Sequence, residues 1–301
     1  MLLLVVETEE IPDAVGDKKR KITRVLENCI EYPKLGEGVN AARRFSDAAM
    51  ERGTEVFKKY AAVAKKHGVQ KFRACATSAS RDAANSKEFY TRMREQFGID
   101  VQIICGDIEA RLSFLGGLLD YQDPAKHALM DIGGGSTEFV CLSAKGELIS
   151  KSTDIGSIRA TELFLRGDPY PKSKIEELES GLKKYWKEIP ADLAQEIRTK
   201  DWVAVAGAPT VLAAMSLGIE SFTSEKIDGH RLSRCDVFDL YESLAIKTKA
   251  QRELISLVGK QRSDTIVAAS AILATAMEFF EKDDVTVSTR GLRHGVLVSD
   301  F

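Results

Sequence analysis

The sequence predicts an α/β protein with two domains. At 301 residues the chain is long for one domain and suits two of ordinary size. In the first half, segments with the periodicity of strands alternate with segments with the periodicity of helices, which is typical of α/β folds. In the middle of the chain, three consecutive glycines at 133–135 separate two apolar runs. We interpret those runs as buried strands joined by a turn that exposes its backbone.

The first half begins with an apolar strand and a long helix. Residues Leu2 to Val6 are apolar and predict the strand. Ser46 caps the helix, in which apolar residues recur every three or four positions until Gly68 ends it. Asn85, with Glu88 three residues later, predicts a capping box at the start of another helix. The other expected elements are strands at 71–76 and 101–105, and helices that end at Gly98 and span 108–119.

The second half begins with the glycine hairpin and becomes mostly helical. The polar segment Tyr121–Pro124 contains a helix-stopping proline and marks the domain boundary. We therefore expect one domain at 1–121 and a second at 122–289, with residues 290–301 packed back on the first. Both halves open with strands and continue with helices, which suits a duplicated α/β domain. Further strands are expected up to Asp154, at 202–206 and at 285–288.

Composition argues against several classes of protein. The chain is 44% hydrophobic and 29% charged with a formal net charge of -2, so no basic excess suggests nucleic acid. The apolar stretch 265–280 is interrupted by polar residues and is too short to span a bilayer, so no membrane partner is expected. Five scattered cysteines without a CxxC pair argue against a disulfide framework and a zinc site. Residues 1–7 carry no basic leader, and we expect a cytoplasmic protein.

The segment 131–138, which reads DIGGGSTE, is the strongest functional signal in the chain. Without side chains, the glycine N–H groups can converge on an anion such as phosphate, and the two hydroxyl residues add donors. A tight hairpin turn without a ligand is the alternative, and the combination of acids, glycines and hydroxyls in one octet disfavours it. The candidate phosphate-binding residues are Gly133, Gly134, Gly135, Ser136 and Thr137.

Two acids flank the glycine turn. Asp131 precedes it and Glu138 follows it. Carboxylate oxygens are the hard ligands that Mg²⁺ prefers, and a phosphate substrate would share the same ion. We therefore predict a Mg²⁺ site at Asp131 and Glu138.

Other segments place a candidate residue next to a predicted strand end. Arg81 lies among small and hydroxyl residues, which suits a guanidinium presented to phosphate, although a surface ion pair with Asp82 is the alternative. Glu109 lies in the first turn of a helix, where it either stabilises the helix dipole or orients an attacking water. Gly207 lies between a strand and a helix whose free N–H groups can bind an anion. Segment 288–295 is a similar transition.

Taken together, five strings resemble the exopolyphosphatase/guanosine pentaphosphate phosphatase (Ppx/GppA) family over nearly the whole chain. They are ATSASRDAAN, GDIEARLSFLG, DIGGGSTE, AGAPTVLAA and STRGLRHGVL, in the family's order. The resemblance implies two ribonuclease-H-like domains of the actin, sugar kinase and heat-shock ATPase superfamily around a central cleft. It implies Glu109 as the catalytic glutamate, Arg81 as a catalytic arginine that binds phosphate, and Asp131 and Glu138 as metal-associated acids. Gly207 matches the later glycine-rich loop.

The resemblance also implies a reaction. Water would attack a terminal phosphoanhydride of inorganic polyphosphate or guanosine pentaphosphate, with Mg²⁺ present and orthophosphate released. We expect polyphosphate or guanosine polyphosphates as partners, and a homodimer. One alternative is a non-catalytic sensor of guanosine polyphosphates. A kinase of the same fold is another, but no segment specifies the additional Asp that it requires.

The chain departs from the family pattern at two places. The family opens with a strand and a D-x-G-S-N-S type loop, whereas this sequence begins at the strand that follows it. We expect about fifteen further residues with that motif to be encoded upstream of Met1. Pro209 stands where the family has small or hydroxyl residues, so one backbone N–H donor is lost.

Overall fold

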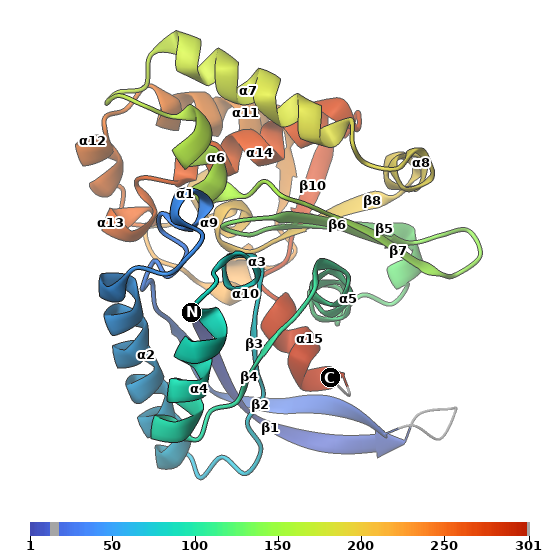
Figure 1. Ribbon diagram of the computed structural model, residues 1–301. Coiled ribbons are helices and arrows are strands. Elements are labelled where there is room, and N and C mark those ends of the chain that lie inside the picture. Colours follow the sequence, from blue (N-terminus) through green and yellow to red (C-terminus); the bar gives the residue numbers. More distant parts are fainter. Residues whose placement is uncertain (13–17, 300–301) are drawn as a thin grey trace. The chain divides into compact units, whose positions relative to one another are not determined.

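The chain forms two units in the computed structural model, which describes residues 1–12 and 18–299 (Figure 1). The first unit comprises Met1–Gly116 together with Leu292–Phe301, and the second comprises Gly117–Gly291. The sequence prediction set the boundary after Tyr121, and the contacts of the structure set it after Gly116. No helix in the described part of the chain is long and apolar enough to cross a membrane.

The first unit contains two separate two-stranded sheets and several helices. Strands β1 (Leu2–Pro12) and β2 (Lys18–Ile30) are antiparallel, and β3 (Ala74–Ala76) and β4 (Val101–Ile103) are parallel. Both β3 and β4 are shorter than the strands that the sequence predicts. The helices are α1 (Val39–Ala42), α2 (Asp47–Lys66), α3 (Ser78–Asp82), α4 (Ser86–Phe97), α5 (Gly106–Gly117), whose last residue belongs to the second unit, and α15 (Leu292–Val298).

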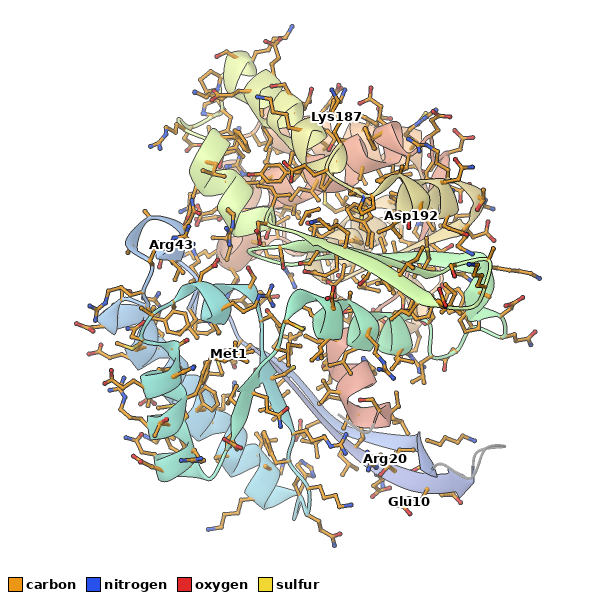
Figure 2. The ribbon with its side chains drawn as sticks, turned by 45° about the vertical axis from the view of Figure 1, so that its right-hand side comes forward. Met1, Glu10, Arg20, Arg43, Lys187 and Asp192 are labelled. Atoms are coloured by element: carbon orange, nitrogen blue, oxygen red, sulfur yellow. The ribbon has the colours of Figure 1, made fainter. Side chains whose placement is uncertain are left out.

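Alternation of side chains explains how the β1–β2 hairpin packs. Leu3 and Val5 are buried and contact Val56 and Tyr60 of α2. Further along, Glu10 lies opposite Arg20 across the two strands (Figure 2). Arg20 Nη1 also donates to the carbonyl oxygen of Ser299 at 3.0 Å, so β2 holds the chain that follows α15. The apolar opening thus forms a strand that is half buried and continues as a charged hairpin.

The helix caps agree with the sequence in one case and differ in another. Ser46 Oγ accepts a hydrogen bond from the Ala49 N–H at 3.2 Å, which confirms the predicted start of α2. Asn85 caps no N–H of α4, so the predicted capping box is wrong, although the helix itself is present. The Asn85 side chain instead accepts from the Phe45 N–H and donates to the Phe45 carbonyl oxygen. This longer-range pairing competes with local capping.

The second unit is built on a six-stranded sheet in the order β7-β6-β5-β8-β10-β9. Strands β5, β6 and β7 form an antiparallel meander, β8 and β10 run parallel to β5, and β9 is antiparallel at the edge. The strands are β5 (His127–Ile132), β6 (Thr137–Leu142), β7 (Leu148–Thr153), β8 (Asp201–Val205), β9 (Arg231–Ser233) and β10 (Asp284–Val287). The helices are η1 (Pro124–Lys126), α6 (Ser157–Phe164), α7 (Lys172–Trp186), α8 (Ala191–Thr199), α9 (Gly207–Ser216), α10 (Ser224–Ile227), α11 (Arg234–Ala245), α12 (Lys249–Glu253), α13 (Gly259–Arg262) and α14 (Ile266–Phe279).

The two faces of this sheet have different roles. Met130, Phe139 and Ala204 belong to the main core cluster, which Trp186 of α7 shares, and α7, α11 and α14 lie on one side of the sheet (Figure 1). Successive side chains of a strand point to opposite faces, so the residues next to these point away from that helical layer. Glu138 is one of them. The polar side chain of Glu138 therefore lies on the face of the sheet that α7, α11 and α14 do not cover.

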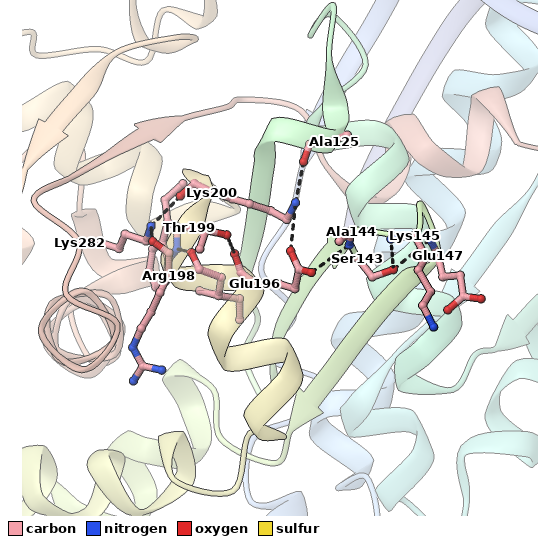
Figure 3. Close-up of polar contacts among 12 residues, drawn as sticks. Ala125, Ser143, Ala144, Lys145, Glu147, Glu196, Arg198, Thr199, Lys200 and Lys282 are labelled. Atoms are coloured by element: carbon pink, nitrogen blue, oxygen red, sulfur yellow. Dashed lines mark hydrogen bonds and ion pairs between the residues drawn. The ribbon is translucent and has the colours of Figure 1, made fainter.

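A polar network near α8 lies at the end of the sheet where β5, β8 and β10 begin and where β6 turns into β7 (Figure 3). Beyond the end of α8, the Lys282 ammonium donates to the carbonyl oxygens of Arg198 and Lys200 at 2.7 and 2.6 Å. Burial lowers the pKa of Lys282. Glu196 accepts a hydrogen bond from the Ala144 N–H at 2.9 Å, in the turn between β6 and β7. These bonds satisfy helix-end carbonyls and tie α8 to the meander.

Candidate active site

The glycine triplet forms the turn between β5 and β6, as the sequence predicts. The Gly133 N–H donates to the Ser136 carbonyl oxygen at 3.0 Å, which closes the turn. Asp131 and Glu138 are direct partners in the antiparallel pair that flanks it. Direct partners project to the same face, with Cβ atoms about 4.5–5.5 Å apart. The hairpin therefore brings the two predicted metal-binding acids together beside the turn.

Gly156, which precedes α6, lies directly under this turn. A Cβ atom at Gly156 would come within 2.6 Å of Gly134 C and 2.7 Å of both Gly133 O and Ser136 N. All three are backbone atoms, so no side-chain movement could relieve the contact. Only glycine allows the chain before α6 to approach the turn this closely.

The first turn of α6 binds the carbonyl oxygens of the glycine turn. Ser157 donates to Gly133 O through its N–H at 2.9 Å and its hydroxyl at 3.2 Å. The N–H groups of Ile158 and Arg159 donate to Gly134 O at 2.8 and 3.1 Å. The first N–H groups of α6 therefore donate to carbonyl oxygens of the protein's own backbone.

These bonds also fix the direction of the N–H groups that share a peptide unit with the two carbonyl oxygens. In a planar trans peptide the C=O and the following N–H point in opposite directions. Because the carbonyl oxygens of Gly133 and Gly134 point toward α6, the N–H groups of Gly134 and Gly135 point away from it. Neither N–H has a hydrogen-bond acceptor within the described residues. Two adjacent donors with this orientation form a cradle for an anion.

Thr137 differs from the sequence prediction. Its hydroxyl donates to the Ile155 carbonyl oxygen at 2.6 Å, and the side chain is fully buried. Thr153 of β7 in turn donates to the Thr137 carbonyl oxygen at 2.9 Å. Because the single hydroxyl hydrogen is used inside the protein, the Thr137 side chain anchors the turn and is not placed to donate to phosphate.

The acid pair suits a hydrated divalent cation. Asp131 is 9% exposed, and Glu138 is fully buried with its Oε1 accepting from Ser152 Oγ at 2.7 Å. In the described part of the chain, no group of three or more His, Cys, Asp and Glu residues could hold a metal ion. Two carboxylates without a third protein ligand fit Mg²⁺, because this ion keeps several waters and usually shares its remaining positions with phosphate.

In the first unit, the structure brings Arg81 and Glu109 together. Arg81 Nη1 donates to Glu109 Oε2 at 2.8 Å and to the Ile104 carbonyl oxygen at 2.9 Å. Glu109 is 6% exposed. Burial, with a smaller contribution from the Glu109 charge, raises the pKa of the nearby Cys75 thiol to about 12. Both bonds come from Nη1. The other N–H groups of the guanidinium have no acceptor within the described residues.

Gly207 lies where β8 ends and α9 begins, as predicted. The residue before it, Ala206, has φ of 81°, and Pro209 lacks an N–H in the first turn of α9. A Cβ atom at Gly207 would lie 3.7 Å from Arg262 Nε. Arg262 also donates to the Leu257 carbonyl oxygen at 3.1 Å. A guanidinium therefore lies beside this second glycine loop.

Sequence reasoning did not select Ser152, Gly156 or Arg262. No local pattern links them to the two glycine loops, since each lies at least fourteen residues away from the group it contacts. A weak signal was available for Gly156, the N-cap of α6, because glycine is among the residues favoured at that position.

The structure defines an α/β protein with a glycine turn flanked by two buried acids, and comparison with known proteins identifies its family. The family model described as the Ppx/GppA phosphatase family matches residues 15–301. Exopolyphosphatase 2 of Mycobacterium tuberculosis is 30% identical over 284 residues, which cover 88% of this chain and 86% of that protein. A bifunctional 3-dehydroquinate synthase/phosphatase of Fusobacterium nucleatum is 31% identical over 95% of this chain and 43% of its own length. The chain belongs to the Ppx/GppA phosphatase family.

Solved structures agree with this assignment. An exopolyphosphatase from Cytophaga hutchinsonii has a TM-score of 0.82 at 26% identity, covering 98% of this chain and 93% of that one. The Ppx/GppA family member of Aquifex aeolicus has a TM-score of 0.78 at 25% identity, covering 99% and 93%. The likeness confirms the predicted fold class, an α/β protein with the fold of the Ppx/GppA family. The exopolyphosphatase relatives support a phosphatase, which is a hydrolase.

Proposed function

We propose that this protein removes the terminal phosphate from inorganic polyphosphate or guanosine pentaphosphate by Mg²⁺-assisted attack of water. The observation that carries the proposal is the glycine turn, which presents the N–H groups of Gly134 and Gly135 beside the Asp131–Glu138 pair. The turn offers donors for phosphate oxygens, and the acids offer ligands for the cation that accompanies phosphate. The names of the exopolyphosphatase relatives support polyphosphate as the substrate class.

Residues of the chain have separate roles in this proposal. The N–H groups of Gly134 and Gly135 hold oxygens of the terminal phosphate where negative charge develops. Asp131 and Glu138 would hold Mg²⁺, which when bound neutralises phosphate oxygens and stabilises the leaving group. Because a phosphoanhydride already has a good leaving group, the remaining task is to place a water molecule for attack.

Glu109 and Arg81 serve the attacking water. Glu109 orients the water and accepts its proton at a carboxylate oxygen. Arg81 holds Glu109 through Nη1, which leaves its other N–H groups to bind a phosphate oxygen. One guanidinium can therefore position the base and the substrate together. A homodimer and a cytoplasmic location stay predictions from the sequence.

Phosphate release from polyphosphate and from guanosine pentaphosphate, each with and without Mg²⁺, tests the proposal. Glu109→Gln should lower kcat by about 10²–10⁴-fold, the contribution of a positioned general base. Its KM should change little, because the amide retains the shape of the carboxylate. Glu88→Gln on α4 is the control and should behave as the parent. Substrate binding without turnover in the parent would instead identify a non-catalytic sensor, and no binding of either substrate would refute the proposal.

A further inference from the structure

We propose that Ser152 of β7 is a positioning residue that holds the Glu138 carboxylate in the orientation needed to bind a divalent cation. Ser152 lies directly opposite Glu138 in the β6–β7 pair, and its Oγ donates to Glu138 Oε1 at 2.7 Å. The inference rests on the proposed function, because it takes Glu138 as a ligand of Mg²⁺.

Ser152, Glu138 and Asp131 form a row across three strands. Each is the direct partner of the next, so all three project to the same face, with Cβ atoms about 4.5–5.5 Å apart. The two carboxylates are neighbours and repel each other when no cation is present. Ser152 lies on the side of Glu138 away from Asp131. Its hydrogen bond therefore draws one oxygen of Glu138 toward β7 and opposes the repulsion.

Two side-chain hydrogen bonds fix the backbone that follows Ser152. The next residue, Thr153, donates through its hydroxyl to the Thr137 carbonyl oxygen at 2.9 Å. Thr137 donates through its hydroxyl to the Ile155 carbonyl oxygen at 2.6 Å. These buried bonds tie the ends of β6 and β7 together at the position of Ser152. A short hydroxyl side chain on this rigid backbone has little freedom, so it can hold the longer Glu138 side chain in place.

A structural role and a positioning role predict different results. If Ser152 only stabilised the strand pair, its replacement would lower stability and leave cation affinity unchanged. If it positions Glu138, loss of the hydroxyl should weaken cation binding, because groups that orient metal ligands typically contribute about 10–100-fold to affinity. The hydroxyl, and not the volume of the side chain, should decide the outcome.

The test compares Ser152→Val with Ser152→Thr, which differ mainly by a methyl group in place of the hydroxyl. Mn²⁺ replaces Mg²⁺, and its binding is followed by electron paramagnetic resonance without substrate. We expect Ser152→Val to weaken Mn²⁺ binding about tenfold or more and Ser152→Thr to stay within about threefold of the parent. The same two substitutions at Ser150 are the control, because Ser150 lies on the same strand and face opposite Val140.

The readout separates this inference from the proposed function. If the parent releases no phosphate yet binds Mn²⁺ at a site that Glu138→Gln weakens, the comparison of the two variants still decides the role of Ser152. In an active parent, Ser152→Val should raise the Mg²⁺ concentration for half-maximal rate by the same factor, with little change at saturating Mg²⁺. Equal Mn²⁺ affinities of Ser152→Val and Ser152→Thr would overturn the inference. So would Mn²⁺ binding that does not depend on Glu138.

Discussion

The second unit contains two glycine loops on neighbouring parallel strands, and they are built in different ways. The turn at 133–136 follows β5, and the loop at Gly207 follows β8. Asp131 and Val205, the residues just before them, are partners across the two strands. The loops therefore begin at the same level of the sheet, yet one is held by a distant segment and the other forms at the start of its own helix.

The glycine turn depends on contacts with residues about twenty positions later. Gly156 lies against its backbone, and the first N–H groups of α6 bind its carbonyl oxygens. The Gly207 loop is local, because the Thr210 hydroxyl in α9 donates to the Ala206 and Gly207 carbonyl oxygens at 3.1 and 3.0 Å. A site held by distant segments should be sensitive to substitutions that touch no ligand, whereas a local loop should tolerate them.

Gly156→Ala should have the largest effect. The added methyl group would overlap backbone atoms of the turn, so the turn must move and its N–H donors lose their alignment. We expect kcat/KM for phosphate release to fall about 10²-fold, as when one transition-state donor is lost. The free energy of unfolding should fall by about 1–3 kcal/mol, the usual cost of overpacking. Urea denaturation and phosphate-release kinetics check both values, and a variant with parental activity would contradict this account of the turn.

Substitutions beside the first loop, where the two acids lie, should change the Mg²⁺ dependence of the rate. Substitutions beside the second loop should not. Asp131→Asn and Glu138→Gln should each raise the Mg²⁺ concentration for half-maximal rate by about tenfold or more, because each removes one of two hard ligands. Val205 occupies the corresponding place before the second loop and offers no ligand. Val205→Thr is therefore the control and should leave the Mg²⁺ titration unchanged. Unaltered titrations in both acid variants would move the cation elsewhere.

Arg262→Gln tests whether the second loop also binds phosphate. Arg262 lies beside Gly207, and a hydrogen bond from a charged donor contributes about 1.5–3 kcal/mol. We expect KM for polyphosphate to rise about tenfold with kcat nearly unchanged, because the residue would hold substrate away from the reacting phosphate. Lys260→Gln removes the same charge from an exposed position and is the matched control. Equal KM values in the two variants would leave the second loop without a substrate role.

Gly207→Ala should have the smallest effect. The nearest atom to an added Cβ is Arg262 Nε at 3.7 Å, which is an ordinary contact. Replacing glycine by alanine at a compatible position usually stabilises a protein by about 0.4–1 kcal/mol. We expect an unchanged or slightly higher midpoint of unfolding, and phosphate release within about threefold of the parent. A loss as large as that of Gly156→Ala would show that the two loops do not differ in the way described.

The elements that the sequence predicted correctly are those in which the signal is local. Ser46 caps α2 because its side chain reaches an N–H three residues away, and the apolar repeat that follows it fits a helix face. The turn at 133–135 was predictable because three glycines between two apolar runs have few other uses. The pairing of Asp131 with Glu138 followed from the same hairpin, since a tight turn places its flanking residues opposite each other.

The tertiary structure decided whatever depends on residues far apart in the chain. Asn85 has a capping sequence, yet it binds the Phe45 backbone forty residues away. Arg81 and Glu109 were separate candidates in the sequence and form one ion pair in the fold. Thr137 was a predicted phosphate donor, and its hydroxyl instead donates to the Ile155 carbonyl oxygen. The sequence by itself determined the features that form locally, which are the cap of α2, the glycine turn and the pairing of its two flanking acids. The partners of Asn85, Arg81 and Thr137 were decided only by the folded chain, because hydrogen-bond competition between distant groups depends on which segments pack together.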